Sequence, residues 1–398
     1  MLRLYILFAA IYLIEGITEV PFILNVYLRN ILQFEPSQIG RILFLGGMWF
    51  VVIKPLVGLL ADSWKRFSTR AMLVFGLFCS AAGWAIIAGA STPLVMGVGV
   101  SLKILAIACL DVLIDGMIVA ASNAKNRSLI QSLVYACRFG GAMLTANVAG
   151  AMIGDTAASF VQIYYFYSVL VLAALIPVAL YRGDALQHGR DVERGSPAEK
   201  VSFRKRLAML GSPGFGWLLA LLFLFSLGAD TSTYMQPLLE ERFSGEFLGR
   251  ILTVFYGGTL AGILLFPLMR LKLSVRTLLI VSLIGWSTVE ISSLSLIKLE
   301  PGWITNLIAA LIYFFGGFCN AFSGIALLTI AAAMCKIRGI ETFAFAAAIS
   351  VKNFTDQSSV LFGGYLMEWV GIDWLFVISA AAGFLPFLVL FKIDYSEV

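Results

Sequence analysis

The stretch LVMGVGVSLKILAIACLDVLIDGMIVA, residues 94–120, is long and apolar enough to cross a bilayer, yet it carries Lys103, Asp111 and Asp115. A spanning helix needs about 20 residues, and a charge at its centre costs roughly 2.5–3.5 kcal/mol on insertion scales. Such charges are therefore expected to face a partner or a water-filled pathway. The stretch predicts a membrane helix that lines a route for ions or substrate.

The composition of the whole chain agrees with this interpretation. Of its 398 residues, 60% are hydrophobic and only 13% are charged, and the mean hydropathy is +0.93. A soluble domain carries about 25% charged residues, so we expect a multi-pass membrane protein and not a soluble enzyme. The net charge of +5 is modest and gives no reason to expect nucleic acid as a partner. The five cysteines and the single histidine lack metal-ligand spacing, so neither a metal nor a cofactor is expected.

Apolar runs of spanning length recur along the chain and predict an all-α membrane protein with twelve transmembrane helices. Lysine and arginine set the orientation: 19 of the 28 fall in segments that would be cytoplasmic with the N-terminus inside, and 5 in exterior segments. The positive-inside rule then places both termini in the cytoplasm. The predicted spans are 4–28, 39–60, 71–90, 94–120, 128–153, 160–180, 215–239, 247–269, 277–297, 304–333, 343–367 and 374–391.

The chain divides into two similar halves. A polar stretch, residues 182–213, separates a six-helix bundle of residues 1–181 from a second bundle of residues 214–398. Matched features recur at offsets of 211 to 216 residues: the paired glycines 46–47 and 257–258, the stretches EGITEVP at 15–21 and DTSTYMQP at 230–237, and the bases at 138 and 352. This pattern predicts two pseudo-symmetric bundles related as parallel repeats, which is the major facilitator arrangement.

Eleven ionisable side chains lie inside the predicted spans. Asp111 and Asp115 are four residues apart, so they share a helix face, and two acids so close are costly to ionise together. One of them is therefore expected to carry a proton. Arg138 enters its span to a depth of about 15 Å, the depth of Asp111, and we predict an Asp111–Arg138 pair. The other ionisable positions are Glu15, Glu19, Lys54, Lys103, Asp230, Glu290, Lys352 and Asp356.

These further charges have different expected roles. Glu15, Glu19 and Asp230 belong to the first helix of each half and are candidates to line a central cavity, by analogy with the fold. Lys352 and Asp356 are four residues apart and either neutralise one another or bind substrate. Glu290 is expected to have a structural or interfacial role, and Lys103 has none that the sequence explains. Three aromatic residues near the charges could stack on a flat ring: Tyr135, Tyr234 and Phe354.

One segment resembles a known family. Residues 54–63 read KPLVGLLADS, in which Gly58 and Asp62 match the gate motif between the second and third helices of major facilitators. Together with the Asp111/Asp115 pair, Gln131-Ser132 and the Arg138-Phe-Gly-Gly run, the segment looks like the folate–biopterin transporter family over residues 20–150. The resemblance implies proton-coupled transport of folates or pterins, with bases for the anionic end and aromatic rings and carboxylates for the flat ring.

The expectation from the sequence is a secondary transporter of an organic anion, most simply a folate or pterin, that works by proton-coupled alternating access as a monomer in the plasma membrane. Another carrier of the same fold, for a drug, a peptide or a siderophore, is the first alternative. A membrane assembly factor that does not transport is the second, and the eleven buried charges argue against it.

Overall fold

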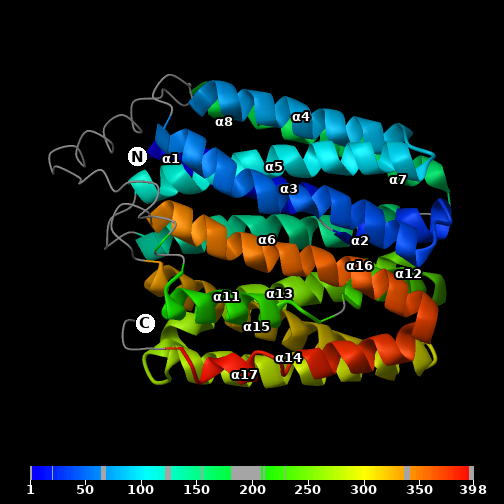
Figure 1. Cartoon of the computed structure of the whole chain (residues 1–398). Helices are drawn as coiled ribbons and strands as arrows, with labels where there is room; N and C mark the ends of the chain where they lie inside the picture. Colours follow the sequence, from blue (N-terminus) through cyan, green and yellow to red (C-terminus); the bar gives the residue numbers. More distant parts are fainter. Residues whose placement is uncertain are drawn as a thin grey trace, which may run out of the picture.

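The computed structural model describes residues 2–19, 21–63, 69–121, 127–153, 156–180, 208, 211–228, 230–335 and 341–393, and these form helices without strands. The helices run side by side, and the first begins and the last ends at the same end of the molecule (Figure 1). We name the opposite end the outer end. The helices are α1 (Leu2–Thr18), α2 (Pro21–Val26), the π-helical turn η1 (Tyr27–Ile31), α3 (Pro36–Ser63), α4 (Thr69–Gly89), α5 (Pro93–Ala121), α6 (Arg127–Met152), α7 (Ala157–Ala173), α8 (Leu175–Leu180), α11 (Pro213–Phe225), α12 (Ser232–Arg242), α13 (Gly245–Arg270), α14 (Val275–Lys298), α15 (Trp303–Met334), α16 (Glu341–Ala382) and α17 (Phe387–Leu390).

Familiar local signals set where several helices begin. The hydroxyls of Ser212, Ser244 and Ser274 accept hydrogen bonds from the backbone N–H three residues later, at the starts of α11, α13 and α14. Proline occupies the first position of α3, α5 and α11, where its missing N–H has no cost. Inside α16, Gly371 has φ of 77°, a left-handed conformation that glycine adopts freely, and this residue separates the last two predicted spans.

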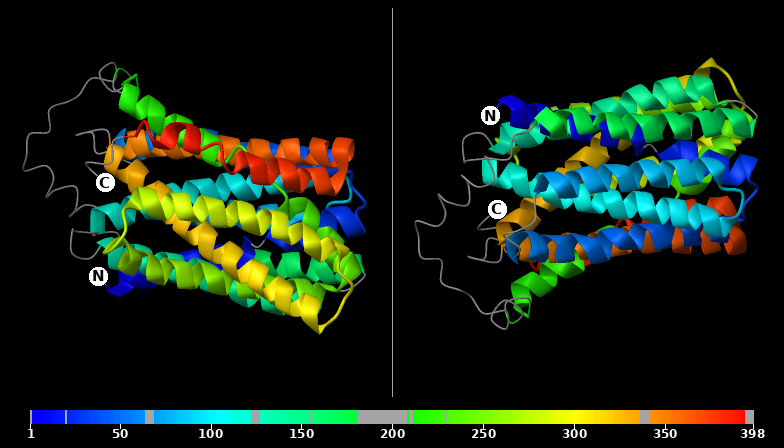
Figure 2. Two further views of the ribbon diagram at one scale, coloured as in Figure 1. Left: turned by 90° about the horizontal axis from the view of Figure 1, so that it is seen from below. Right: turned by 90° about the horizontal axis from the view of Figure 1, so that it is seen from above.

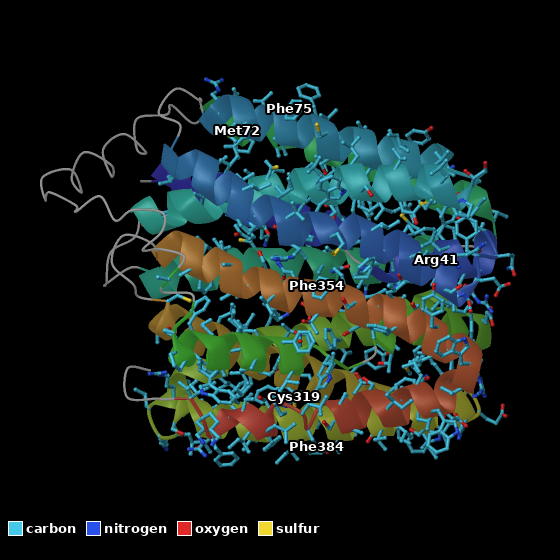
Figure 3. The ribbon with its side chains drawn as sticks, viewed as in Figure 1. Arg41, Met72, Phe75, Cys319, Phe354 and Phe384 are labelled. Atoms are coloured by element: carbon cyan, nitrogen blue, oxygen red, sulfur yellow. The ribbon has the colours of Figure 1, made fainter. Side chains whose placement is uncertain are left out.

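Within the described part of the chain, nine helical stretches are long and apolar enough to cross a membrane. Helix α6 and the shorter α11 occupy two further predicted spans, and Gly371 divides the last of the nine stretches into two. The all-helical membrane fold is confirmed, while the number twelve stays a prediction. Large apolar side chains such as Phe75 and Phe384 point outward from the bundle, as lipid-facing residues should (Figure 3).

The first span of each half is broken. Helix α1 ends at Thr18 and the span resumes as α2 at Pro21, while α11 ends at Phe225 and its span resumes as α12 at Ser232. The first break falls in the stretch EGITEVP, and the second ends within the first two residues of DTSTYMQP, the stretches that the internal repeat matched. The repeat seen in the sequence therefore has a structural counterpart.

The halves meet through two helix pairs, α3 with α16 and α6 with α13, and through α2 with α12 at the outer end (Figure 2). One hydrophobic core is formed by buried side chains between residues 4 and 178. It also includes Leu239, Leu248 and Leu296 from the outer ends of α12, α13 and α14. A second core lies within the remainder of the second half. The halves thus share a core at the outer end, which is closed in this structure.

Polar contacts complete this closure. The side-chain amide of Asn25 on α2 donates to Gln236 on α12 at 2.9 Å, and Asn30 donates to the carbonyl of Pro237 at 3.1 Å and to Glu240 at 2.7 Å. On the α6–α13 pair, a methyl group at Gly249 would lie 2.3 Å from the carbonyl oxygen of Ala146. The contacts of α2 and η1 with α12, and of α6 with α13, are called the outer seal below.

Candidate functional site

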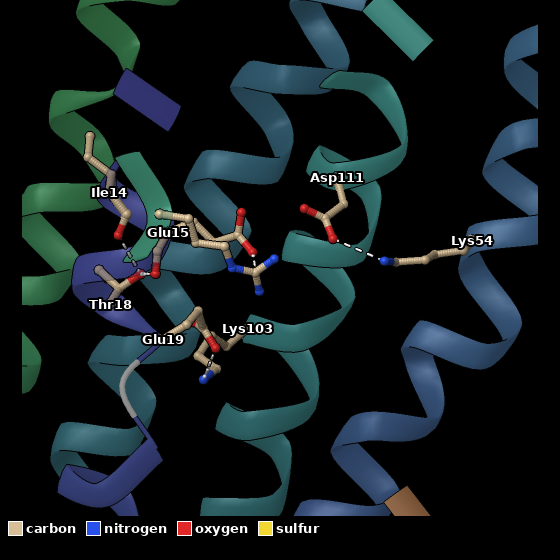
Figure 4. Close-up of polar contacts among 8 residues, drawn as sticks. Ile14, Glu15, Thr18, Glu19, Lys54, Lys103 and Asp111 are labelled. Carbon is tan, nitrogen blue, oxygen red and sulfur yellow. Dashed lines mark hydrogen bonds and ion pairs between the residues drawn. The ribbon is translucent and has the colours of Figure 1, made fainter. Parts of the chain in front are cut away.

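Three acid–base pairs lie inside the first half, on α1, α3, α5, α6 and the break after α1 that contains Glu19 (Figure 4). Each joins two segments distant in the sequence, so six of the charges predicted from the sequence form ion pairs. Because every acid has a base at hydrogen-bonding distance, these six charges balance. The pairs are Glu15 Oε1 with Arg138 Nη2 at 2.9 Å, Glu19 Oε2 with Lys103 Nζ at 2.9 Å, and Asp111 Oδ2 with Lys54 Nζ at 3.0 Å.

The Glu15–Arg138 pair depends on a close crossing of α1 and α6. A methyl group at Gly16 would lie 1.9 Å from the carbonyl oxygen of Arg138, and one at Gly141 would lie 2.4 Å from the carbonyl oxygen of Leu13. Only glycine allows the two backbones to approach this closely. The sequence Glu15-Gly16, near the end of α1, therefore supplies both an acid and the space that brings Arg138 to it.

The predicted Asp111–Arg138 ion pair is wrong. Arg138 binds Glu15, and Asp111 binds Lys54 on α3. The partners differ because α5 packs mainly against α3 and α4, while α6 packs against α1 and α13. The consecutive helices α5 and α6 thus pair their charges with other helices, α3 and α1, and not with each other.

Lys103, which the sequence left unexplained, has two partners. Its ammonium binds Glu19 and lies 4.4 Å from the centre of the Trp84 ring. Trp84 in turn stacks on Tyr164 with ring centres 5.5 Å apart. Lys103 is buried, with 6% of its side chain exposed. This arrangement holds the unwound residue Glu19 against α5.

The charges differ in how open they are to solvent. Arg138 keeps 37% of its side chain exposed although it lies in the middle of a span, while its partner Glu15 keeps 7%. In the second half, Lys352 and Asp356 on α16 keep 25% and 36% exposed. Among the described pairs, these are the accessible mid-span charges, and each half contributes a base.

Lys352 and Asp356 do form a pair, with Nζ and Oδ2 2.6 Å apart. The neutralising interpretation of their spacing is confirmed, and their exposure leaves them open to a ligand as well. Lys352 also lies 5.9 Å from the centre of the Phe225 ring at the end of α11. The break in the seventh span is therefore next to this pair.

Asp230 and Glu290 flank the start of α12. Asp230 accepts hydrogen bonds from the backbone N–H of Ser232 at 3.0 Å, from the hydroxyl of Ser232 at 2.7 Å and from the hydroxyl of Thr233. Glu290, from α14, accepts a hydrogen bond from the hydroxyl of Thr231 at 2.8 Å. Both acids thus contact the segment that resumes the seventh span.

Aromatic rings join the halves next to Arg138. Phe139 on α6 and Tyr256 on α13 have ring centres 6.3 Å apart, and Tyr135 stacks on Phe139 at 6.2 Å. Of the rings named from the sequence, Tyr234 instead donates its hydroxyl to the carbonyl of Val360 at 2.6 Å, a structural contact. No sequence feature pointed to Tyr256, because only the packing of α6 on α13 brings it to this place.

A cavity of about 30 Å³ lies within the first bundle, lined by Glu15, Thr18, Ser80 and Asp111 together with apolar side chains of α1, α4, α5 and α7. This volume holds about one water molecule. The side chains of Asp62 and Asp115 and the surroundings of Gly58 lie outside the described part of the structure. The roles predicted for these three residues stay predictions.

Comparison with known proteins supplies the family. The profile of the Major Facilitator Superfamily matches residues 4–249. A protein of Synechocystis sp. described as "Folate-biopterin transporter" is 24% identical over 391 residues, covering 91% of this chain and 74% of that protein.

Solved structures agree on the fold. Two structures of nucleoside transporter NupG superpose with TM-scores of 0.76 and 0.72 at 16% identity, over 99% of this chain and 99% of theirs. A D-xylose-proton symporter superposes with a TM-score of 0.74 at 15% identity, over 100% of this chain and 98% of its own.

Proposed function

This chain belongs to the major facilitator superfamily of membrane transporters, and from that premise we propose that it carries a folate or pterin by proton-coupled alternating access. The observation that carries the proposal is the pair of accessible mid-span bases, Arg138 and Lys352, one from each half. An organic anion held between them would bind both halves at once. The similarity to the folate–biopterin transporter of Synechocystis supports this substrate class.

The ligand's two chemical ends have matching groups. Folates are anionic at the glutamate end, which suits the guanidinium of Arg138, because arginine forms bidentate, charge-assisted hydrogen bonds with carboxylates. The flat ring suits stacking on Phe139 and Tyr256, which lie beside Arg138 where the α6–α13 contact of the outer seal ends. A neutral sugar would not need the two bases.

Proton coupling is assigned to the first half. The three described pairs balance three acids with three bases, so Asp115, a helical turn from Asp111, adds one acid in excess of them. A proton shared by Asp111 and Asp115 would remove the excess charge. Asp111 keeps 10% of its side chain exposed, and its partner Lys54 keeps 18%. Glu15 and Glu19 serve as the partners that hold Arg138 and Lys103.

The transport cycle follows from the closed outer seal. The two halves, residues 1–181 and 214–398 joined by the linker 182–213, would rock about the mid-membrane layer. Gly58 and Asp62 would close the opposite end when the outer end opens. We place the protein in the plasma membrane as a monomer with both termini in the cytoplasm, because its lysines and arginines concentrate on that side.

Uptake by liposomes tests the proposal. Purified protein in sealed vesicles is given radiolabelled folate or biopterin, with and without an inward proton gradient. We expect accumulation that the gradient increases. Asp111→Asn should abolish the response to the gradient while exchange of labelled for unlabelled substrate persists. No uptake under either condition, with insertion verified, would exclude folates and pterins as substrates.

A further inference from the structure

Glu290 differs from four other described acids inside the spans. Glu15, Glu19, Asp111 and Asp356 each bind a base, whereas Glu290 is buried and its described partner is the hydroxyl of Thr231. A single hydroxyl does not offset the cost of burying a full negative charge. Where the described residues supply no base, a carboxyl group at this depth is most stable when it is protonated.

The surrounding groups reinforce this assignment. The titratable groups near Glu290 are Asp230, at the start of α12, and Tyr313, on the neighbouring helix α15. Neither provides a positive charge. Asp230 accepts three hydrogen bonds at the N-terminus of α12, whereas the buried Glu290 accepts the one described bond from Thr231. Of the two acids, Glu290 is therefore the one that takes a proton.

Glu290 is also connected to the outer seal. Its partner Thr231 immediately precedes α12, and this short helix carries Gln236, Pro237 and Glu240, which bind Asn25 and Asn30 of the first half. The chain of contacts runs from α14 through Thr231 and α12 to the other half of the molecule. A change in charge at Glu290 thus acts on the helix that closes the outer end.

We propose that Glu290 is a proton-binding site of the second half, and that its proton holds α12 in the position that closes the outer seal. Loss of the proton creates a buried negative charge beside Asp230. The repulsion and the need for hydration favour movement of α12 away from α14, which opens the seal. The site extends the proton coupling proposed above to the second half, but it does not depend on the substrate being a folate.

The test needs no substrate. Spin labels replace Glu35 at the start of α3 and Trp303 at the start of α15, both exposed, in a variant without the native cysteines. The distance between labels is measured from acidic to alkaline pH. We expect the parent protein to open as the pH rises and Glu290→Gln to stay closed throughout. The matched control Glu246→Gln, an exposed acid paired with Arg250, should follow the parent.

Infrared difference spectra supply a second readout. At neutral pH, Glu290→Gln should lose the absorption of one protonated carboxyl group relative to the parent, while any absorption from Asp111 and Asp115 remains. A label distance that follows the same pH curve in the parent and in Glu290→Gln, or an unchanged carboxyl absorption, would overturn the proposal. These results differ from failed folate uptake, which would leave both readouts intact.

A second variant covers the case in which Glu290→Gln does not fold. Thr231→Val keeps the shape of the side chain and removes the hydroxyl that donates a hydrogen bond to Glu290. A hydrogen bond to a charged acceptor is about twice as strong as a neutral one, so its loss disfavours the ionised form. The opening transition should move to higher pH by about 1 unit. A transition at the parent's pH would contradict the proposal.

Discussion

Arg138 on α6 contacts Glu15 on α1 at 2.9 Å, at the point where Gly16 brings α1 against the carbonyl oxygen of Arg138 itself. The acid that holds the arginine and the glycine that makes room for it are consecutive residues. The guanidinium is thereby fixed on its acid while more than a third of its side chain stays exposed. A pre-positioned, accessible cation of this kind is what an anion-binding site needs.

The crossing can be tested by adding one methyl group. Gly16→Ala places a carbon 1.9 Å from the carbonyl oxygen of Arg138, so α1 and α6 must separate. Overpacking costs about 1–3 kcal/mol, and we expect a lower melting temperature and a loss of transport. Gly140→Ala on α6 is the control, because nothing lies within 4 Å of its added methyl. Equal effects of the two changes on stability would show that the crossing is not tightly packed.

The buried pair of Lys103 and Glu19 should contribute to stability and not to binding. Lys103→Met leaves Glu19 as an uncompensated acid, and breaking a buried pair costs about 3–5 kcal/mol. Combining it with Glu19→Gln removes the charge, so the double variant should recover most of the melting temperature measured in detergent. A double variant no more stable than Lys103→Met would mean that the two residues are not coupled.

The outer seal should depend on the close approach of α6 and α13. Gly249→Ala would set a methyl group 2.3 Å from the carbonyl oxygen of Ala146 and force the outer ends apart. We expect a cysteine introduced at Ala149, a buried alanine on this part of α6, to react faster with a water-soluble thiol reagent. Gly257→Ala on the same helix has no atom within 4 Å and serves as the control. An unchanged reaction rate in Gly249→Ala would argue against this seal.

A variant of the Lys352–Asp356 pair can show whether the pair stabilises the protein or binds substrate. Exchanging the two residues in a Lys352→Asp, Asp356→Lys double variant keeps an ion pair four residues apart on α16 but moves the cation by one helical turn. We predict normal insertion and melting temperature with substrate affinity reduced about tenfold, about 1.4 kcal/mol. Binding retained at the parental level would assign the pair to stability alone.

The sequence predicted the class of fold and the location of the charged layer, because both depend on local composition. Apolar runs of spanning length place the helices, and an acid or base inside such a run is placed near mid-membrane by its position in the run. Arg138 and Asp111 are examples, each placed by counting residues from the end of its span. The matched stretches around Glu15 and Asp230 likewise coincide with breaks in two spans.

The partners of these charges could not be predicted, because pairing depends on which helices are neighbours. Arg138 finds Glu15 across α1 and α6, residues 123 positions apart in the chain. Lys103 is stabilised by Glu19 and by Trp84, on two other helices. Tyr256 meets Phe139 only because the halves pack through α6 and α13. None of these relationships leaves a periodic signal in the sequence.

Binding of folate to purified protein measures the central claim, that Arg138 holds an organic anion at mid-membrane. Affinity is determined by calorimetry for the parent, for Arg138→Gln and for the control Arg250→Gln, an exposed arginine that also pairs with an acid. Loss of a charge-assisted contact worth about 1.5–3 kcal/mol predicts binding at least tenfold weaker in Arg138→Gln and unchanged in Arg250→Gln. Parental affinity in Arg138→Gln, with the fold intact, would contradict the account.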